Sequence, residues 1–346
     1  MNRMQNTNEQ GIAGQARNDK RCVAVVAGGY SSEFVISLKS AEGIQSFLDK
    51  EKYIVYIVLI TKDKWVVKLQ DNQEIDLDKN DFSFIKDGEK IKFDFAYITI
   101  HGTPGEDGLL QGYFDMLDIP YSCCGVLAAS LTFNKQFCKN YLLDFDVRVA
   151  PAILLRKNDW WNASDIIYEL GLPIFVKPND GGSSFGITKV NSETGLQKAI
   201  NLAFSEGREV MIESFMAGTE VTCGCYQIGD EIIVLPVTEV VSKNEFFDFE
   251  AKYTASKVEE ITPARISEAL TEKVQSLTKK IYGRLRAKGI IRVDYIILPQ
   301  GEVRMLEVNT TPGMTVTSFI PQQIKAAGLD IREVMTEIIE NELNRK

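Results

Sequence analysis

The order of apolar and polar residues predicts alternating strands and helices in the first third of the chain. Residues 22–27 form a continuous apolar run, which is typical of a buried parallel strand. Two glycines and two serines follow, and apolar residues then recur at helical spacing across 34–48. Apolar runs at 53–60 and 93–100 predict two more strands, whereas the acidic, polar stretch 71–90 is expected to be a surface excursion. This pattern indicates an α/β domain.

The rest of the chain predicts shorter strands and four further helices. The strands share apolar runs between turn-forming residues, and they are expected at 173–178, 187–190 and 209–215 and from residues 219 and 231. The helices share apolar residues at helical spacing, and they are expected at 134–143, at 266–285, from residue 321 and at 331–343. The aromatic-rich segment 241–263 is predicted to be a long ordered loop, since loops of this length are usually functional or disordered.

The stretch 289–312 organises the second half of the chain, because two alternating apolar runs flank a turn-forming cluster and predict a β-hairpin. With Gln300 and Gly301 at the tip, Asp294 faces Glu307 and Arg292 faces Asn309. Side chains alternate between faces with period two, so these four polar groups share one face. The opposite face is apolar and is expected to be core, with Ile291, Val293, Tyr295, Leu306 and Val308.

Two carboxylates placed directly opposite each other destabilise a sheet unless a cation reverses the sign of the interaction. Asp294, Glu307 and Asn309 offer the oxygen ligands that Mg²⁺ prefers. A solvated strand face on which Arg292 neutralises the two acids fits the same pattern. The hairpin alone leaves both interpretations open.

Other stretches place polar residues where ligands commonly bind. Glu33 follows the first strand and suits an ammonium group, although it equally suits the first turn of a helix. His101, the only histidine, lies in a Gly- and Pro-rich loop after a strand. Lys177 lies within an apolar strand and therefore needs an anionic partner. The Gly/Ser loop 179–186 fits either a phosphate-binding lid or a hairpin turn.

Together these features suggest a nucleotide-phosphate site without a Walker motif. Lys135 and Lys177 are well separated in sequence and fit a clamp on the α- and β-phosphates, with Mg²⁺ bridging the outer phosphates. Nothing in the sequence resembles a Ser-His-Asp triad or a nucleophilic cysteine.

Composition limits the class of protein. The 346 residues carry a net charge of −9 and a pI of about 5.0, which argues against a nucleic-acid partner. No apolar run reaches membrane-spanning length, and the polar residues 1–20 are interpreted as a disordered tail rather than an export signal. The 6 cysteines therefore favour reduced thiols in the cytosol.

Five motifs, in this order, resemble the D-alanine–D-alanine ligases of the ATP-grasp superfamily. The resemblance runs from about residue 23 to the last helix. The motifs are GGYSSEFVISLKS at 28–40, HGTPGEDGLLQG at 101–112, VKPNDGGSSFG at 176–186, FDFEAKY at 247–253, and RVDY with LEVNTTPGMTVTSFIP within 292–321. Several long motifs in one order are far more specific than any one of them.

The resemblance implies a fold of mixed α/β and α+β class, namely an ATP-grasp fold with an amino-terminal Rossmann-like (pre-ATP-grasp) domain. After the tail at 1–20, the expected parts are a Rossmann-like substrate domain at 21–120 and a central ATP-grasp lobe at 121–213. A carboxy-terminal lobe at 214–346 would carry the metal site and the long substrate loop. A cytoplasmic homodimer, with no nucleic-acid or membrane partner, is also expected.

The resemblance further implies ATP-dependent ligation of two D-alanines to D-alanyl-D-alanine for peptidoglycan precursors. The first D-alanine carboxylate would attack the γ-phosphate of ATP to give D-alanyl phosphate, and the second D-alanine amine would displace phosphate. By family match, Glu33 would bind the first ammonium in a triad with Ser183 and Tyr253, beside His101. Arg292 and the Gly313 N–H would stabilise the oxyanion, and Lys252 and Ser318 would bind the second carboxylate.

The nucleotide and metal residues are carried over in the same way. Lys135 and Lys177 would hold the α- and β-phosphates, with Ser184 in the loop above them. Glu213, Phe215 and Met216 would contact adenine through backbone groups, and Glu220 would bind the ribose. Two Mg²⁺ or Mn²⁺ would be held by Asp294, Glu307 and Asn309.

The sequence departs from the family pattern in places that concern the substrate pocket. Phe34 and Val35 follow Glu33 where the family often has a basic residue and an acid, and Phe247 and Phe249 stand where tyrosines are common. The alternatives are a ligase that uses D-lactate or D-serine as acceptor, and an ATP-binding module without catalysis. The Lys252–Tyr253 pair favours the dipeptide-forming type.

Overall fold

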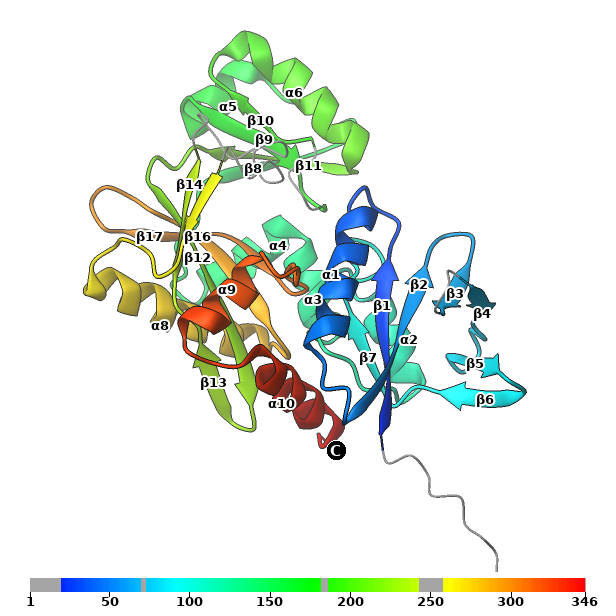
Figure 1. The fold of residues 1–346 in the computed structure, drawn as a ribbon. Helices are drawn as coiled ribbons and strands as arrows, with labels where there is room; N and C mark the ends of the chain where they lie inside the picture. The colour runs from blue at the N-terminus through cyan, green and yellow to red at the C-terminus, as the bar shows by residue number, and fades with distance from the viewer. Residues whose placement is uncertain (1–19, 70–72, 182–185, 243–257, 346) are drawn as a thin grey trace, which may run out of the picture.

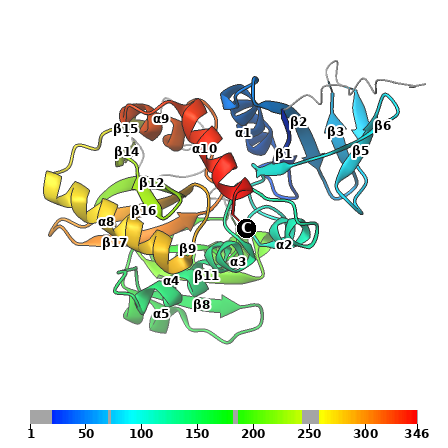
Figure 2. The same ribbon diagram turned by 90° about the horizontal axis from the view of Figure 1, so that it is seen from below.

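The structure is a computed structural model that describes residues 20–69, 73–181, 186–242 and 258–345. Three large sheets follow one another along the chain, and Figures 1 and 2 show them arranged around a common centre. We call them the amino-terminal, central and carboxy-terminal sheets. None of the helices described is both long and apolar enough to cross a membrane.

The amino-terminal sheet confirms the predicted α/β pattern. Its order is β4-β3-β2-β1-β7, and β1 (Arg21–Gly28) is parallel to both β2 (Tyr53–Ile60) and β7 (Phe95–Ile98). The helices are α1 (Phe34–Phe47) and α2 (Leu109–Met116). Parallel strands end at one edge of the sheet, so the loops after β1 and β7 meet there. The Ser31 hydroxyl in the first loop donates a 2.9 Å hydrogen bond to the His101 carbonyl oxygen in the second.

The stretch 71–90, predicted to be a surface excursion, is mostly exposed but has regular structure. Outside residues 70–72, which are not described, this stretch contains three strands. β4 (Glu74–Asp76) pairs with β3 (Trp65–Lys68) and extends the sheet, and β5 (Ser83–Lys86) forms a hairpin with β6 (Glu89–Lys92). The segment is held down by Phe82 and Phe84, which are fully buried among other aromatic rings. Its overall polarity concealed these anchors.

The central sheet separates an apolar face from a polar one. Its order is β10-β9-β11-β8 with every pair antiparallel, and α5 (Ala163–Leu170) and α6 (Glu193–Glu206) form an apolar core with it. The strands are β8 (Ala152–Arg156), β9 (Ile174–Pro178), β10 (Thr188–Val190) and β11 (Glu209–Ser214). Val176 and Ile212 belong to that core, so alternation directs Lys177 and Glu213 to the opposite face.

The carboxy-terminal sheet carries the predicted hairpin. Its path is β15-β14-β12-β16-β17, with β13 beside β12. The strands are β12 (Thr219–Ile228), β13 (Glu231–Val234), β14 (Thr238–Ser242), β15 (Val258–Ile261), β16 (Ile291–Ile297) and β17 (Val303–Asn309). The helices are α3 (Val126–Phe133), α4 (Lys135–Leu143), α8 (Glu268–Leu285), α9 (Phe319–Ala326) and α10 (Ile331–Leu343). α3, α4 and α8 share one apolar core with this sheet.

The segment predicted as a long loop at 241–263 is partly a strand pair. Its two ends belong to β14 and β15, which pair antiparallel. Residues 243–257, which include the aromatic cluster of the prediction, lie outside the described residues.

The register of the β16–β17 hairpin is confirmed at its functional end and wrong at its tip. Asp294 pairs with Glu307 and Arg292 with Asn309, as predicted, but the register shifts after Asp294. Tyr295 therefore pairs with Met305 rather than with Leu306. The turn is correspondingly longer, since the Leu298 N–H donates to the Glu302 carbonyl oxygen at 2.9 Å. A bulge at residue 306 gives Met305 the core position predicted for Leu306, which packs on the opposite face.

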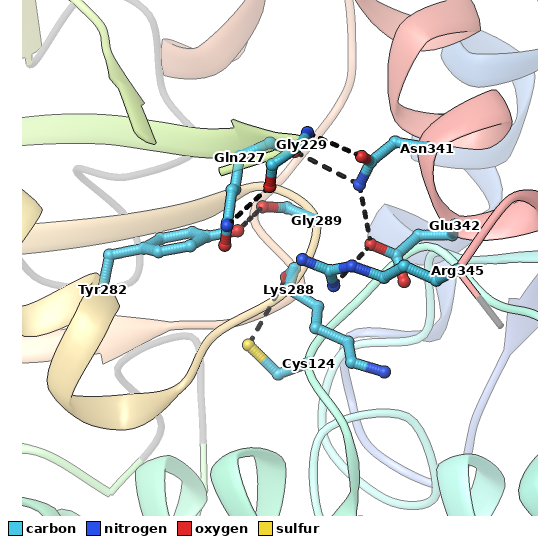
Figure 3. A network of polar contacts seen from close by, with 9 residues as sticks. All are labelled: Cys124, Gln227, Gly229, Tyr282, Lys288, Gly289, Asn341, Glu342 and Arg345. Carbon is cyan, nitrogen blue, oxygen red and sulfur yellow. Dashed lines mark hydrogen bonds and ion pairs between the residues drawn. The ribbon is translucent and has the colours of Figure 1, made fainter. Parts of the chain in front are cut away.

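A polar network fixes the last helix to the carboxy-terminal sheet (Figure 3). The Asn341 side chain accepts a 2.8 Å hydrogen bond from the Gly229 N–H and donates to the Gln227 carbonyl oxygen at 3.5 Å. Its amide also donates to Glu342, which forms an ion pair with Arg345 at 2.9 Å. α10 therefore closes the β12–β13 turn and packs, through its other face, on α1 of the amino-terminal sheet.

The same network surrounds the turn that precedes β16. The Tyr282 hydroxyl donates to the Gly289 carbonyl oxygen at 2.9 Å, and the Cys124 thiol lies 3.5 Å from the Lys288 carbonyl oxygen (Figure 3). Gly289 has φ +61. A Cβ there would lie 1.8 Å from the Ser122 carbonyl oxygen, so only glycine allows this close approach.

Gly289→Ala is therefore expected to lower the free energy of unfolding by about 2–4 kcal/mol, which combines overpacking with a left-handed backbone. Gly229→Ala is the matched control, because φ is +57 there and no atom lies within 4 Å of its Cβ. The control should lose about 1 kcal/mol. Urea unfolding of both variants measures the difference, and equal losses would contradict the close-packing explanation.

Candidate active site

Glu33 and His101 lie buried at the edge where β1 and β7 end, as the sequence predicted. Glu33 is the N-cap residue of α1, yet among the described residues its side chain caps no N–H of that helix. A negative charge at this position also suits the positive end of the helix dipole, so both interpretations of Glu33 stand. The Nε2 atom of His101 is buried and has no hydrogen-bond partner in the described part of the chain. A buried polar atom of this kind usually has a partner, so a bound ligand is expected beside it.

Glu106 joins this cluster, although the sequence analysis did not select it. Its carboxylate accepts a 2.7 Å hydrogen bond from the Gly102 N–H and another of 2.7 Å from the Thr311 hydroxyl. Burial raises the pKa of Glu106, the neighbouring His101 opposes this, and the charge of Glu33 adds to it. Glu106 thus ties the His101 loop to the segment after β17.

Glu106→Gln is expected to keep these two hydrogen bonds, because a glutamine offers one acceptor and one donor and the Thr311 hydroxyl can reverse. The raised pKa means that the ionised carboxylate is disfavoured in the folded chain. Removing its charge at pH 7 should therefore preserve or raise the free energy of unfolding. Activity should fall about tenfold, because the two bonds that remain lose their charge assistance, a difference of about 1 kcal/mol for one bond.

The pH dependence distinguishes a charge effect from damage to the fold. The wild-type rate should decline on acidification at a higher pH than an ordinary glutamate would give, because the pKa is raised. The Glu106→Gln variant should lack that part of the profile. A variant with the wild-type rate would show that the charge is not used.

Arg292 and Asp294 form a tight pair on β16. The guanidinium donates two hydrogen bonds of 2.8 Å, one to each carboxylate oxygen. The centre of the Phe319 ring lies 5.3 Å from the guanidinium carbon, within the range of a cation–π contact. Burial alone would lower the pKa of Arg292, but the Asp294 carboxylate outweighs it and raises the pKa. The guanidinium is therefore a fixed, permanently charged group.

The remaining donors around Asp294 orient the predicted metal ligands. The Thr222 hydroxyl donates to Asp294 at 2.6 Å, and the Asn309 amide nitrogen donates to it at 3.1 Å. Because the amide nitrogen faces Asp294, the Asn309 amide oxygen is directed away from it, and Asn309 shares a strand face with Glu307. Asp294, Glu307 and Asn309 share one face of the hairpin and offer two carboxylates and one amide oxygen. Among the described residues no group of three or more acidic, histidine or cysteine side chains converges. The set of two carboxylates and one amide fits a hard divalent cation.

A buried group of three charges lies on the polar face of the central sheet. Lys177 and Glu213 form an ion pair through one carboxylate oxygen, and Lys139 on α4 pairs with the other oxygen. The predicted anionic partner of Lys177 is therefore Glu213. Burial alone would raise the pKa of Glu213, but the two lysines outweigh it and lower the pKa to about 2. Lys139 was not predicted, although it follows Lys135 by one helical turn.

Lys135 connects this group to the metal ligands. Its ammonium donates to the Gly181 carbonyl oxygen, and its N–H to the Asn179 carbonyl oxygen at 3.1 Å. Burial lowers the pKa of Lys135, the Glu307 charge opposes this and the Lys177 charge reinforces it. The side chains of Lys135, Lys177 and Glu307 therefore lie close enough for their charges to act on one another.

An apolar patch lies beside the lysines, where adenine binding was predicted. Met216 packs with Ala150 and Ile296, and Leu306 at the bulge joins them. Lys189 lies over the Phe215 ring, 4.4 Å from its centre. Glu220 on β12 pairs with Ile296 on β16, so it lies next to this patch. Apolar side chains next to polar groups are the kind of lining that suits a purine base.

The segment after β17 holds the last two predicted residues. Ser318 is the N-cap residue of α9, and its hydroxyl accepts a 3.1 Å hydrogen bond from the Thr315 N–H. A Cβ at Gly313 would lie 3.2 Å from the Ser318 hydroxyl, so the two are neighbours. The Met314 N–H donates to the Ser40 hydroxyl of α1 at 3.3 Å. This segment is therefore held against α1, the helix that begins directly after Glu33.

Four predicted site residues lie outside the described residues: Ser183, Ser184, Lys252 and Tyr253. The cysteines do not belong to the site. Cys223 and Cys225 fill the buried face of β12, and all six are free thiols. Burial raises the pKa of Cys223 to about 12, which leaves it unreactive at neutral pH.

Comparison with known families gives two matches. A model described as "D-ala D-ala ligase N-terminus" matches residues 22–124, and one described as "D-ala D-ala ligase C-terminus" matches residues 142–340. A D-alanine–D-alanine ligase of Parabacteroides distasonis is 61% identical over 328 residues, which cover 94% of this chain and 99% of that relative.

Two solved structures show the same architecture. The VanG D-Ala:D-Ser ligase from Enterococcus faecalis is 31% identical with a TM-score of 0.83, and the match covers 93% of this chain and 99% of that one. The D-alanine–D-alanine ligase from Bacillus anthracis complexed with ATP is 28% identical with a TM-score of 0.74, covering 93% of this chain and 97% of that one.

Proposed function

The chain belongs to the D-alanine–D-alanine ligase family, and we propose how its residues divide the work of joining two D-alanines. It is an ATP-dependent ligase that forms D-alanyl-D-alanine for peptidoglycan synthesis, and its fold is the ATP-grasp fold. The mechanism is argued from three features of the described residues, namely buried lysines, facing carboxylates and a fixed guanidinium, whose charges act on one another.

In the proposed first step, the carboxylate of one D-alanine attacks the γ-phosphate of ATP, giving D-alanyl phosphate and ADP. Lys135 and Lys177 hold the α- and β-phosphates. The negative charge of the phosphates balances the two ammonium groups, which are costly to bury alone. Glu33 binds the ammonium group of the first D-alanine, and His101 directs its buried Nε2 at the same substrate. Both substrates are thereby oriented, which can supply roughly 7–11 kcal/mol of the barrier.

Asp294, Glu307 and Asn309 would hold the divalent cations, Mg²⁺ or Mn²⁺. When bound, these ions neutralise charge on the β- and γ-phosphates. The amide orientation of Asn309, fixed by its 3.1 Å bond to Asp294, supports this assignment.

In the proposed second step, the amine of the second D-alanine attacks the acylphosphate carbonyl, and inorganic phosphate leaves. Arg292 and the Gly313 N–H donate to the oxygen that gains negative charge. Ser318 and Lys252 bind the carboxylate of the second D-alanine. Ser183 and Tyr253 complete the triad with Glu33, and Ser184 belongs to the loop over the phosphates.

The nucleotide base is proposed to lie on the apolar patch beside β11. Phe215 and Met216 follow that strand and offer backbone groups to adenine, as does Glu213, and Glu220 binds the ribose. The side chain of Glu213 has a separate role, since both of its oxygens are occupied by lysines.

We further propose a cytoplasmic homodimer. Leu109 and Met116 on α2 and Leu127 on α3 are strongly exposed, and the two helices are neighbours. Exposed apolar groups gathered on adjacent helices are typical of an interface. Six free thiols agree with a reducing compartment.

The experiment measures ADP and phosphate release with ATP, Mg²⁺ and D-alanine, and then with D-lactate or D-serine added. Release with D-alanine alone, with D-alanyl-D-alanine as product, is expected. Release that requires D-lactate or D-serine would assign the chain to the alternative acceptor class and would overturn the proposed roles of Lys252 and Tyr253.

A further inference from the structure

Two buried lysines share a single carboxylate at the proposed nucleotide site. The side chains of Lys139, Lys177 and Glu213 are only 2%, 6% and 3% exposed. Each oxygen of Glu213 is taken by one ammonium group. The three groups together carry one positive charge, which is costly to bury unless an anion balances it.

The three side chains reach this point from separate elements. Lys177 on β9 pairs with Met211 on β11, and Glu213 lies two residues further along that strand. Lys177 and Glu213 are therefore diagonal neighbours on one face of the sheet. They can form an ion pair whether or not Lys139 is present. Lys139 comes from α4, which packs against the carboxy-terminal sheet. The ion pair between Lys139 and Glu213 therefore joins the core of the carboxy-terminal sheet to the central sheet.

Lys139 is too enclosed to serve as a surface ion pair. Burial lowers its pKa, the Glu213 charge opposes this, and Lys177 lowers it further. A second ammonium group beside Lys177 is unfavourable for folding. Lys177 would be sufficient as the counter-ion of Glu213. The second lysine must therefore serve something other than the stability of this pair.

We propose that Lys139 is a positioning residue for ATP: it neutralises Glu213, so that the charge of Lys177 is available to a phosphate group. The inference rests on the proposed role of Lys177 in phosphate binding. Without Lys139, Lys177 would be the only counter-ion of Glu213. If Lys177 then bound a phosphate, the buried Glu213 carboxylate would lose its only partner. This loss would weaken the binding of ATP by about 10²–10³-fold.

The test compares dissociation constants of ATP and adenosine for the wild type, Lys139→Met, Lys177→Met and Lys139→Met with Glu213→Gln. Methionine keeps the length of the buried stem, and Glu213 in the single variant remains paired with Lys177, so the fold should persist. Lys139→Met should weaken ATP binding about 10²-fold. Adenosine binding should be unchanged, because it has no phosphate. Thermal melting checks the fold of each variant.

The double variant provides the decisive comparison. With Glu213 uncharged, Lys177 has no competing partner, so the double variant should recover most of the ATP affinity that Lys139→Met loses. Cys138→Ala is the control for packing of α4, because Cys138 is the buried neighbour of Lys139, and it should bind ATP normally.

Each other outcome has a definite meaning. Unchanged ATP affinity in Lys139→Met, an equal loss for ATP and adenosine, or no recovery in the double variant would overturn the role of Lys139. Unchanged ATP affinity in Lys177→Met would instead overturn the proposed phosphate contact of Lys177, which separates the two hypotheses.

Discussion

Glu307→Gln should lower the turnover of ligation by about 10³-fold, because a metal ion contributes several kcal/mol to charge stabilisation at a phosphoryl group. Glu307 faces Asp294 across the β16–β17 pair, and its charge acts on both Lys135 and Arg292. Glutamine keeps the shape of the side chain but removes the charge that binds a cation. Steady-state ADP release at saturating D-alanine and a range of Mg²⁺ concentrations measures the effect.

The control is Glu302→Gln, at the tip of the same hairpin. Glu302 pairs with Arg304 at 2.9 Å near the surface, where an ion pair contributes little. Its turnover should equal that of the wild type. Glu307→Gln should also unfold at a similar temperature, because two facing carboxylates repel each other without a cation. Normal turnover in Glu307→Gln would mean that this hairpin does not hold the catalytic metal.

The functional end of this hairpin could be predicted from the sequence because it depends on two local rules. A turn-forming cluster fixes the position of the hairpin, and period two then decides which residues share a face. The tip departed from the prediction because the turn spans more residues than Gln300 and Gly301. The bulge at residue 306 compensates for the difference, so Asp294 still faces Glu307.

Contacts between distant segments could not be predicted in the same way. Glu106 meets Thr311 across 205 residues, and Lys139 meets Glu213 across 74. No periodicity relates such pairs, since they depend on how separate sheets pack. A signal existed for Lys139, which lies one helical turn after Lys135 in an otherwise apolar or polar uncharged stretch.

Average polarity was a poor guide where a few aromatic residues decide the structure. In the stretch 71–90, Phe82 and Phe84 are buried although most of their neighbours are charged. The division of the chain at 120 and 213 stays a prediction. α3 and α4, which follow residue 120, share a core with the carboxy-terminal sheet rather than with the central one.

Arg292→Lys should lower kcat by about 10²–10³-fold, the usual loss when one donor to a developing oxyanion is removed. Lysine keeps the charge, but it cannot make two parallel bonds to Asp294 or stack on Phe319. Its ammonium therefore has no fixed direction. The KM for ATP should change little, because the loss concerns the second step. Single-turnover measurements of dipeptide formation and of ADP release separate the two steps.

Arg265→Lys is the matched control, because Arg265 makes the same two-bond contact, with Glu239, on the exposed side of the same sheet. Arg265→Lys is the same chemical change away from the proposed active site, so the kcat of this variant should stay at the wild-type value. Both variants should lose some stability, and Arg292→Lys more, because its pair is buried. If Arg292→Lys lowers the melting temperature but leaves kcat unchanged, Arg292 only supports Asp294. If kcat falls and dipeptide formation slows while ADP release does not, the guanidinium acts on the oxyanion of the second step.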